Sequence, residues 1–280
     1  FDGSAVLGSC TLGGGVCTVN AVGLSSGPHS LSASYGGSAA ALGSTSIPLV
    51  ATVTPTGSRT TLVSSVNPAA YGSSVTFTAT VATSDGSVAT GSVTFTDNGA
   101  PLSSCALTGG VCSIASSSLS IGTHVIAATY GGDANHTGSV ADLLSQQISL
   151  APTTTTLTSD VNPSITGSLV TFTASVTSAA GTPTGSIVLS ENGTLLATCG
   201  LAAGSCSMPL IGLSLGTHTL VATYGGDPSN AVSASAALSL IVVKATTTLA
   251  VVSAAPNPAV VGTTVAVAVS VGPASATGTV

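Results

Sequence analysis

Hydrophobic and polar residues alternate along several short stretches of the chain, with the two-residue period of a half-buried β-strand. One such stretch, GTHTLVATYGGD, starts at Gly216 and ends in a Gly-Gly turn. It recurs as GTHVIAATYGGD from Gly122 and as GPHSLSASYGGS from Gly27. A strand that returns with its own turn signal indicates a chain built of repeats.

Other short motifs recur at nearly the same interval and define the length of the repeat. The pair Asn-Pro starts at Asn67 and returns 95 residues later each time, at Asn162 and at Asn257. A repeat of this length is too long for a solenoid unit and suits one small β-sandwich domain. The alternating positions, together with abundant Thr and Val, predict an all-β fold.

One complete repeat shows how many strands each domain should contain. Turn signals lie at Asn162-Pro163, at Asn192-Gly193 and at Ala203-Gly204, where a hairpin is expected. The predicted strands of this copy cover residues 153–157, 170–176, 185–190, 195–201, 205–210, 217–224 and 233–243. Short strands at this spacing predict a Greek-key β-sandwich.

The repeat register divides the chain into two complete domains and two halves. The complete domains are predicted at residues 58–150 and 151–244, the C-terminal half of a domain at residues 1–57, and the N-terminal half of a domain at residues 245–280. Together the two halves predict one split domain at the chain ends.

The match between the two halves rests on short sequence identities. The last residues, Thr277-Gly-Thr-Val280, resemble Thr90-Gly-Ser-Val93, and Phe1-Asp-Gly3 is aligned with the residues from Phe95 to Gly99. Half a sandwich leaves apolar faces and sheet edges uncovered. We therefore expect either completion by the next subunit, which gives a head-to-tail polymer, or one much longer continuous chain of repeats.

The amino-acid composition argues against several classes of function. Charged residues make up 4% of the chain, the basic ones are Arg59 and Lys244, and Trp is absent. A nucleic-acid surface needs clustered Lys and Arg, so no nucleic-acid partner is expected. No apolar run reaches about 18 residues, so no membrane span is expected. A surface of Ser and Thr hydroxyls suits either packing against copies of the same chain or O-glycosylation.

Six cysteines form three pairs with identical spacing, C-x6-C, around a glycine-containing centre. They are Cys10 and Cys17, Cys105 and Cys112, and Cys199 and Cys206. Two strands that flank a turn bring such positions within disulfide distance. A metal site would need C-x2-C spacing or nearby histidines, so three local disulfides are predicted, outside the cytoplasm.

Histidine and tyrosine recur once in each repeat at fixed strand positions. They are His29, His124 and His218, and Tyr35, Tyr130 and Tyr224. A catalytic histidine would normally stand once beside a unique nucleophile or carboxylate, so these residues are interpreted as packing positions. No catalytic, cofactor-binding or metal-binding residue is predicted, and the chain is not expected to be an enzyme.

Four polar loop residues have alternative interpretations. Asp133 and Asp227 follow Gly-Gly and are interpreted as turn-capping residues, with a weak calcium site as the alternative. Asn135-His-Thr137 and Asn192-Gly-Thr194 match the N-glycosylation sequon, so Asn135 and Asn192 are candidate glycosylation sites.

Runs such as TTTTLTSDVNPSITGSLVTFTASV, TPTGSIVLSENGTLL and GTHTLVATYGGDPSN resemble bacterial immunoglobulin-like repeats of group 3. The resemblance covers almost the whole chain and implies tandem immunoglobulin-like sandwiches. Such repeats occur in large extracellular and cell-surface proteins. The cysteine pair is a departure, since members of the family usually lack it at this position.

These observations favour a structural role outside the bacterial cell. The leading hypothesis is a subunit or segment of an extracellular filament or surface fibre, whose partners are copies of itself joined head to tail. The second hypothesis is an adhesin stalk or binding module of a large cell-surface protein, which would contact cell-surface glycans or proteins. A module attached to a secreted polysaccharide enzyme is the third.

Overall fold

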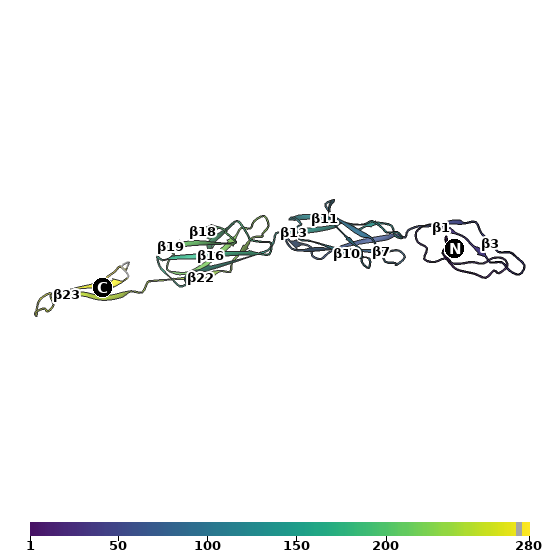
Figure 1. Ribbon diagram of the computed structural model, residues 1–280. Helices are drawn as coiled ribbons and strands as arrows, with labels where there is room; N and C mark the ends of the chain where they lie inside the picture. The colour runs from purple at the N-terminus through teal and green to yellow at the C-terminus, as the bar shows by residue number, and fades with distance from the viewer. Residues whose placement is uncertain (273–275) are drawn as a thin grey trace. The chain divides into compact units, whose positions relative to one another are not determined.

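The computed structural model describes residues 1–272 and 276–280, and these residues form β-strands joined by turns and loops (Figure 1). The chain divides into two units, residues 1–149 and 150–280. Within the described residues, no helix is long and apolar enough to cross a membrane. The prediction of an all-β fold is confirmed.

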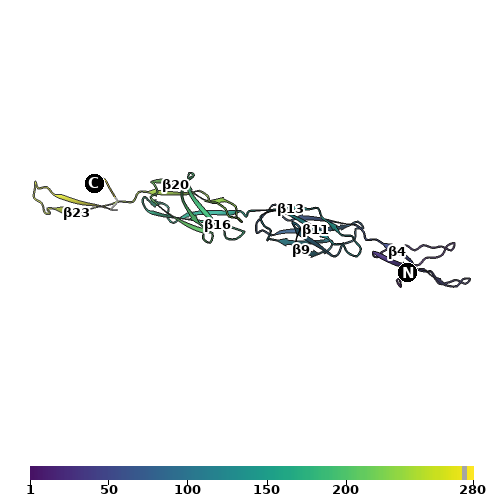
Figure 2. The ribbon, with the colours of Figure 1, turned by 90° about the horizontal axis from the view of Figure 1, so that it is seen from above.

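The first unit contains a two-layered sandwich. A three-stranded sheet has the order β10-β7-β5, and a larger sheet has the order β6-β13-β11-β8-β9 with β12 beside β11. Figure 2 shows β13, β11 and β9 of the larger sheet in the same sandwich. The strands are β5 (Ser58–Ser64), β6 (Ala69–Ala70), β7 (Val75–Thr83), β8 (Ser92–Asp97), β9 (Ala100–Ala106), β10 (Val111–Ser116), β11 (Gly122–Tyr130), β12 (Ser139–Val140) and β13 (Leu144–Ser149).

The second unit contains a sandwich with the same order of strands. Its sheets are β14-β16-β19 and β15-β22-β20-β17-β18, with β21 beside β20. The strands are β14 (Thr153–Ser159), β15 (Ser164–Ile165), β16 (Leu169–Ser178), β17 (Ser186–Glu191), β18 (Thr194–Gly200), β19 (Ser205–Ile211), β20 (Gly216–Tyr224), β21 (Ser233–Ala234) and β22 (Leu238–Val243).

The alternating pattern of the sequence produces the core of each sandwich. Along β7 the apolar residues Val75, Phe77 and Ala79 are fully buried, whereas the threonines between them lie on the other face. Phe172 and Tyr224 are likewise fully buried in the second sandwich. Burial of each large apolar side chain stabilises the fold by about 1.5–3 kcal/mol, so these positions fix which face of each strand turns inward.

The hairpin predicted around Ala203-Gly204 is wrong. The two strands on either side of this turn, β18 and β19, lie in different sheets, and β9 and β10 do the same in the first unit. Ala203 and Gly204 both have positive φ, 51° and 76°, which turns the chain sharply from one layer to the other. The connection is a corner between the layers because the two strands pair in different sheets, β18 with β17 in the larger sheet and β19 with β16 in the smaller one.

Two further differences concern the last strand and the Asn-Pro turn. The single strand predicted over residues 233–243 is divided into β21 and β22, and Ser235 between them exchanges hydrogen bonds with the main chain of Ala222. After the Asn-Pro turn, the short strand β15 pairs in parallel with β22, a strand pairing that the sequence pattern did not indicate.

Residues 1–57 form β1 (Gly27–Leu31), β2 (Ser34–Tyr35), β3 (Ser44–Thr45) and β4 (Leu49–Val53), in which β1 pairs with β4 and β2 with β3. Phe1 and Ser32 exchange two main-chain hydrogen bonds, of 2.7 and 3.0 Å. Thr96 is paired with Ala127 at the same place in the complete sandwich. Phe1 is therefore equivalent to Thr96, which lies within the segment Phe95–Gly99 that the sequence matched to Phe1–Gly3.

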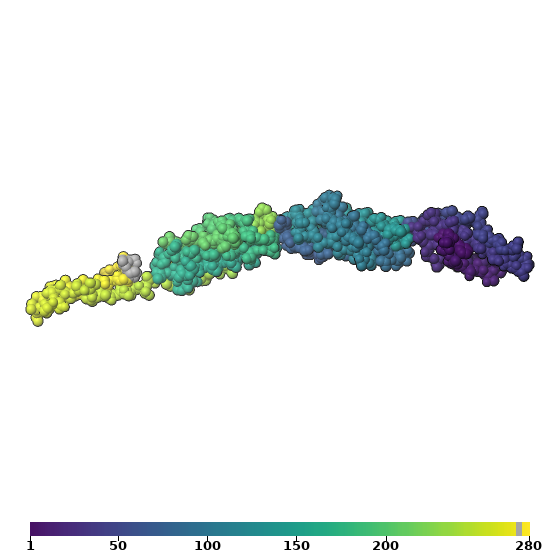
Figure 3. Space-filling model, in the orientation of Figure 1, coloured from purple at the N-terminus to yellow at the C-terminus, as the bar shows by residue number. Residues whose placement is uncertain are grey.

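At the other end of the chain, β23 (Thr248–Ala255) and β24 (Ala266–Gly272) form an antiparallel pair. This pair stands in the place of β5 and β7 in the order of the repeat. Figure 3 shows the residues of this hairpin in yellow. Residues 273–275 of the predicted half-domain lie outside the described residues. A domain that combines the two halves stays a prediction.

Candidate functional site

Each cysteine pair forms a disulfide, and in the two complete domains this bond closes the corner between the two layers. The disulfides Cys10–Cys17, Cys105–Cys112 and Cys199–Cys206 have Cα–Cα distances of 5.8, 5.9 and 6.0 Å. In the complete domains, each disulfide joins the edge strand of the larger sheet to the edge strand of the smaller one. These two disulfides therefore hold the two layers of their domains together.

Replacing Cys105 and Cys112 with serine is expected to lower the free energy of unfolding by about 2 kcal/mol, because the disulfide closes a short loop in the unfolded chain. Thermal unfolding of the variant beside the unmodified chain measures this loss. Reduction of the unmodified chain should raise its mass by about 6 Da, as expected for three disulfides. An unchanged mass would contradict the pairing.

A buried histidine in each repeat lies between two oxygen acceptors. The Nδ1–H of His124 donates to the Asp97 carboxylate at 2.7 Å, and its Nε2–H donates to the carbonyl oxygen of Ser120 at 2.8 Å. His218 bonds in the same way to Glu191 and to the carbonyl of Ser214. Because a carbonyl and a carboxylate can only accept, both ring nitrogens must carry protons, which selects the imidazolium form.

These partners shift the histidine pKa values upward. For His218 the hydrogen bond to the Ser214 carbonyl is the main cause, and the Glu191 carboxylate adds to it. Burial alone would lower the pKa of His124, but its hydrogen bonds to Ser120 and Asp97 outweigh that effect and raise it. In residues 1–57, His29 bonds to Asp2 at 2.6 Å, and this bond is the main reason that its pKa is raised.

The sequence contained a signal for these pairs that its analysis missed. The acidic residue stands 27 positions before the histidine in all three repeats. The three pairs are Asp2–His29, Asp97–His124 and Glu191–His218. A carboxylate that recurs with its histidine indicates a buried ion pair, so the histidines do more than fill space.

A second polar cluster surrounds the aspartate that follows the Gly-Gly turn in each of the two complete domains. The Asp227 carboxylate accepts hydrogen bonds from the main chain and hydroxyl of Thr184 and from the main chain and side-chain amide of Asn230. Asp133 is placed likewise, with Thr90 on one side and the Nδ1–H of His136 on the other. The clusters therefore tie the loop after β11 or β20 to the segment before β8 or β17.

The hydrogen-bond donors also explain the electrostatics of this carboxylate. Burial would raise the pKa of Asp133, but the hydrogen bonds from His136, Thr90 and Asn135 outweigh it and hold the pKa far below its usual value. Its oxygens face N–H and O–H donors, which is the geometry of a turn cap. Among the described residues, no group of three or more His, Cys, Asp or Glu lies together as metal ligands would.

The tyrosines that precede these turns are core residues. Tyr130 and Tyr224 are fully buried, and burial raises the pKa of each to about 12.

The two asparagines of the N-glycosylation sequons lie at the surface. Asn192 is exposed in the turn between β17 and β18, and Asn135 is exposed in the loop after β11. Glycosylation at either residue stays a prediction.

The Asn-Pro motif attaches the first strands of a domain to its last strand. The side-chain amide of Asn67 donates to the carbonyl of Ser145 at 2.7 Å, and its oxygen accepts from the main-chain N–H of Gln147 at 3.0 Å. Asn162 makes the same two bonds to Ser239 and Ile241. The asparagine side chain thus extends the short parallel ladder of β6 with β13, or of β15 with β22.

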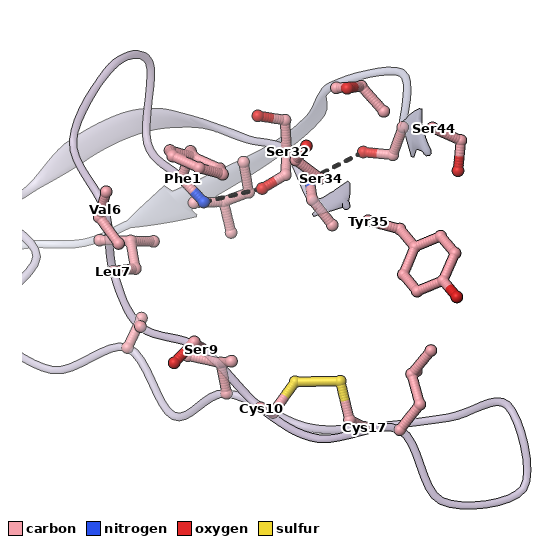
Figure 4. A pocket seen from close by; sticks show the side chains of 18 residues that line it. Phe1, Val6, Leu7, Ser9, Cys10, Cys17, Ser32, Ser34, Tyr35 and Ser44 are labelled. Atoms are coloured by element: carbon pink, nitrogen blue, oxygen red, sulfur yellow. Dashed lines mark hydrogen bonds between the residues drawn. A yellow bond between two sulfur atoms is a disulfide. The ribbon is translucent and has the colours of Figure 1, made fainter. Parts of the chain in front are cut away.

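An open apolar cleft of about 730 Å³ lies within residues 1–57 (Figure 4). Phe1, Leu7 and Tyr35 line it, and the Cys10–Cys17 disulfide lies along its wall. Leu7, Tyr35 and the two cysteines have counterparts 95 residues later that belong to the core of a complete sandwich or pack against it: Leu102, Tyr130, Cys105 and Cys112. The cleft therefore corresponds to the inner face of such a sandwich.

Two segments, residues 62–149 and 157–243, match the family model described as bacterial Ig-like domain (group 3). No curated protein matches the chain. Solved structures with a similar fold include the fibronectin(III)-like modules of Clostridium thermocellum CbhA (15% identity, 66% of this chain and 93% of that chain, TM-score 0.28). The human OSCAR ligand-binding domain is another (15% identity, 65% of this chain and 97% of that chain, TM-score 0.25). The Yersinia pseudotuberculosis adhesin InvE is a third (15% identity, 65% of this chain and 58% of that chain, TM-score 0.28). Since the two matched segments make up more than half of its length, the chain belongs to the group 3 family of bacterial immunoglobulin-like domains.

Proposed function

We propose that this chain is a structural segment of an extracellular bacterial surface fibre, in which each immunoglobulin-like domain bears tension along the polypeptide. Its domain family and its three disulfides suggest an extracellular or cell-surface protein. The observation that carries the mechanical role is the parallel pairing of strands near the two ends of each complete domain.

The direction of these strands decides how a domain responds to force. In the second unit the chain enters through β14 and β15 and leaves through β22, and β15 runs parallel to β22. Tension applied at the two ends of the domain pulls β15 and β22 in opposite directions along their own axes. The hydrogen bonds of Ser164–Ile165 with Val242–Val243 are then loaded together in shear, so they cannot open one after another.

The Asn162 amide adds two hydrogen bonds to the same strand, at Ser239 and Ile241. It therefore lies directly on the path of the load. Asn67 occupies this place in the first unit, so each complete domain carries one such clamp. The disulfide lies at the opposite edge of the sandwich and keeps the layers joined after the clamp opens.

Replacing Asn162 with alanine is expected to lower the unfolding force of one domain and to leave the other unchanged. Loss of the two hydrogen bonds should also reduce the free energy of unfolding by about 1–2 kcal/mol. Single-molecule stretching of the whole chain measures both domains in one trace, so the domain with Asn67 serves as the internal reference.

A matched control separates mechanical strength from stability. Met208 is buried on β19, at the far edge of the smaller sheet, and Met208→Ala should cost about 2–5 kcal/mol through the cavity it leaves. The mechanical proposal requires that Asn162→Ala lowers the unfolding force by more than Met208→Ala does, for each kcal/mol of unfolding free energy that is lost. An equal or smaller loss of unfolding force would overturn it.

An adhesin stalk is the second candidate, because the same clamp would transmit load to a binding domain elsewhere.

A further inference from the structure

His136 differs from the other three histidines in the group that faces its Nε2 atom. In His29, His124 and His218 this atom lies against a main-chain carbonyl, which can only accept a hydrogen bond. In His136 it lies 2.6 Å from the Oγ atom of Ser87, a hydroxyl that can also donate. Among the four histidines, His136 is therefore the one that can be neutral with Nε2 as the acceptor of a hydroxyl proton.

The other nitrogen of this ring is held by the Asp133 carboxylate. The Nδ1 atom of His136 lies 2.8 and 2.9 Å from the two carboxylate oxygens. An ionised carboxylate only accepts hydrogen bonds, so the neutral ring carries its proton on Nδ1 and leaves Nε2 able to take another. Ser87, His136 and Asp133 thus stand in the order of nucleophile, base and orienting carboxylate by which a serine hydroxyl is activated.

The three side chains are arranged from the surface inward. Ser87 is exposed in the loop between β7 and β8, whereas the side chains of His136 and Asp133 are 4% and 10% exposed. The main chain and hydroxyl of Thr90 donate to Asp133, which fixes the loop after β11 against the segment before β8. A reagent in solution can therefore reach the Ser87 hydroxyl, while the ring behind it is held in place and shielded from water.

The second domain provides a natural reference that lacks this arrangement. Asn230 stands 94 residues after His136 and donates to Asp227 through its side-chain amide. Gly181 stands 94 residues after Ser87 and has no side chain. The turn cap is thus kept by an amide that is not basic, so capping alone requires neither the histidine nor the serine beside it.

We propose that Ser87 is a nucleophile that takes up acyl groups from neutral or cationic esters, with His136 as its general base and Asp133 as a positioning residue. The Ser87 Oγ atom bonds to the carbonyl carbon of the ester, and its proton passes to Nε2 of His136. The bond from this carbon to the ester oxygen then breaks, and the leaving alcohol takes the proton. Water releases the acyl group as a carboxylic acid by the same two transfers, so the sum is hydrolysis of the ester.

Asp85, on the other side of the serine, bears on the path of the proton and on the choice of ester. Its Oδ1 atom lies 2.7 Å from the Ser87 Oγ atom and accepts the main-chain N–H of the same residue at 3.1 Å. Hydrogen bonds from Ser87 lower the pKa of Asp85 to about 2, so this carboxylate is charged at neutral pH and is too weak a base to keep the hydroxyl proton. The proton therefore goes to His136, and the negative charge beside the serine disfavours anionic esters.

Reaction of the whole chain with p-nitrophenyl acetate, a small neutral ester, tests the proposal. The unmodified chain should release p-nitrophenol, and peptide mass mapping after an acid quench should find the acetyl group on Ser87. Ser87→Ala should lower the release to the background rate of the ester. Ser84→Ala is the matched control and should react like the unmodified chain, because Ser84 lies in the same loop but donates to the carbonyl of Gly57.

The variant His136→Asn separates the role of the base from the stability of the fold. Asparagine occupies this position in the second domain, so the turn cap should be kept, and urea unfolding checks that it is. Acetylation of Ser87 should nevertheless slow by about 100-fold, the lower end of the range for general-base catalysis.

Three results would overturn the proposal. They are an acetylation rate that His136→Asn leaves unchanged, an acetyl group found on other residues but not on Ser87, and a release of p-nitrophenol that Ser87→Ala leaves unchanged. The last two do not depend on the folding of the His136 variant. The inference goes beyond the mechanical function proposed above, and neither test relies on the other.

Discussion

Replacing Asp133 with alanine is expected to lower the free energy of unfolding of its domain by about 3–5 kcal/mol, the largest loss that we expect from a single polar residue. The carboxylate is 10% exposed and accepts hydrogen bonds from Thr90, Asn135 and His136. Its removal leaves several donors without a partner in a partly buried site, and the cost of these orphaned groups exceeds the loss of a single hydrogen bond.

Urea unfolding of the whole chain measures this loss, with Asp142→Ala as the control. Asp142 belongs to the same domain, but it is exposed, so its replacement should change stability by less than about 0.5 kcal/mol. The pKa of Asp133 is lowered in the folded state, so its contribution is present above the usual carboxyl pKa of about 3.9 and is lost as pH falls. If both variants lose the same stability, the Asp133 cluster does not stabilise the domain.

The buried histidines are expected to make the domains less stable as the solution becomes more alkaline. The pKa values of His124 and His218 are raised in the folded state. Their contribution is therefore complete below the unfolded pKa of about 6.5 and is lost as pH rises through the folded pKa. Hydrogen bonds to a charged group are about twice as strong as neutral ones, so loss of the charge should cost about 1 kcal/mol per pair.

The double variant His124→Gln/His218→Gln tests this pH dependence, because glutamine keeps a hydrogen-bond donor but does not titrate. Urea unfolding should show that the unmodified chain loses stability between pH 6 and 8.5, whereas the variant is less stable at pH 6 and changes little over the same range. An identical pH slope for both chains would show that the histidines are neutral in the folded state. The stabilising contribution of the aspartates is lost only in acid. The free energy of unfolding should therefore be highest between about pH 4 and 6.5.

The sequence determined the features that depend on neighbouring residues and on repetition. Alternating positions such as Val75, Phe77 and Ala79 located the strands, since burial of one face requires a two-residue period. The returning Asn-Pro and Gly-Gly motifs set the repeat length, and the cysteine spacing brought out the pairs that the structure joins. The resemblance to group 3 bacterial immunoglobulin-like domains rested on these local patterns and is confirmed.

The tertiary structure decided which distant strands meet, because no local pattern encodes a partner some 80 residues away. It placed the strands at Ala203-Gly204 in different sheets, so the Cys199–Cys206 disulfide joins two layers. It brought Asn162 onto β22, a contact that depends on how the strands are packed, and it revealed the Glu191–His218 pair, which the recurring spacing of 27 residues could have indicated. It also fixed the register of Phe1, since main-chain pairing with Ser32 decides a position that the short sequence match had left open.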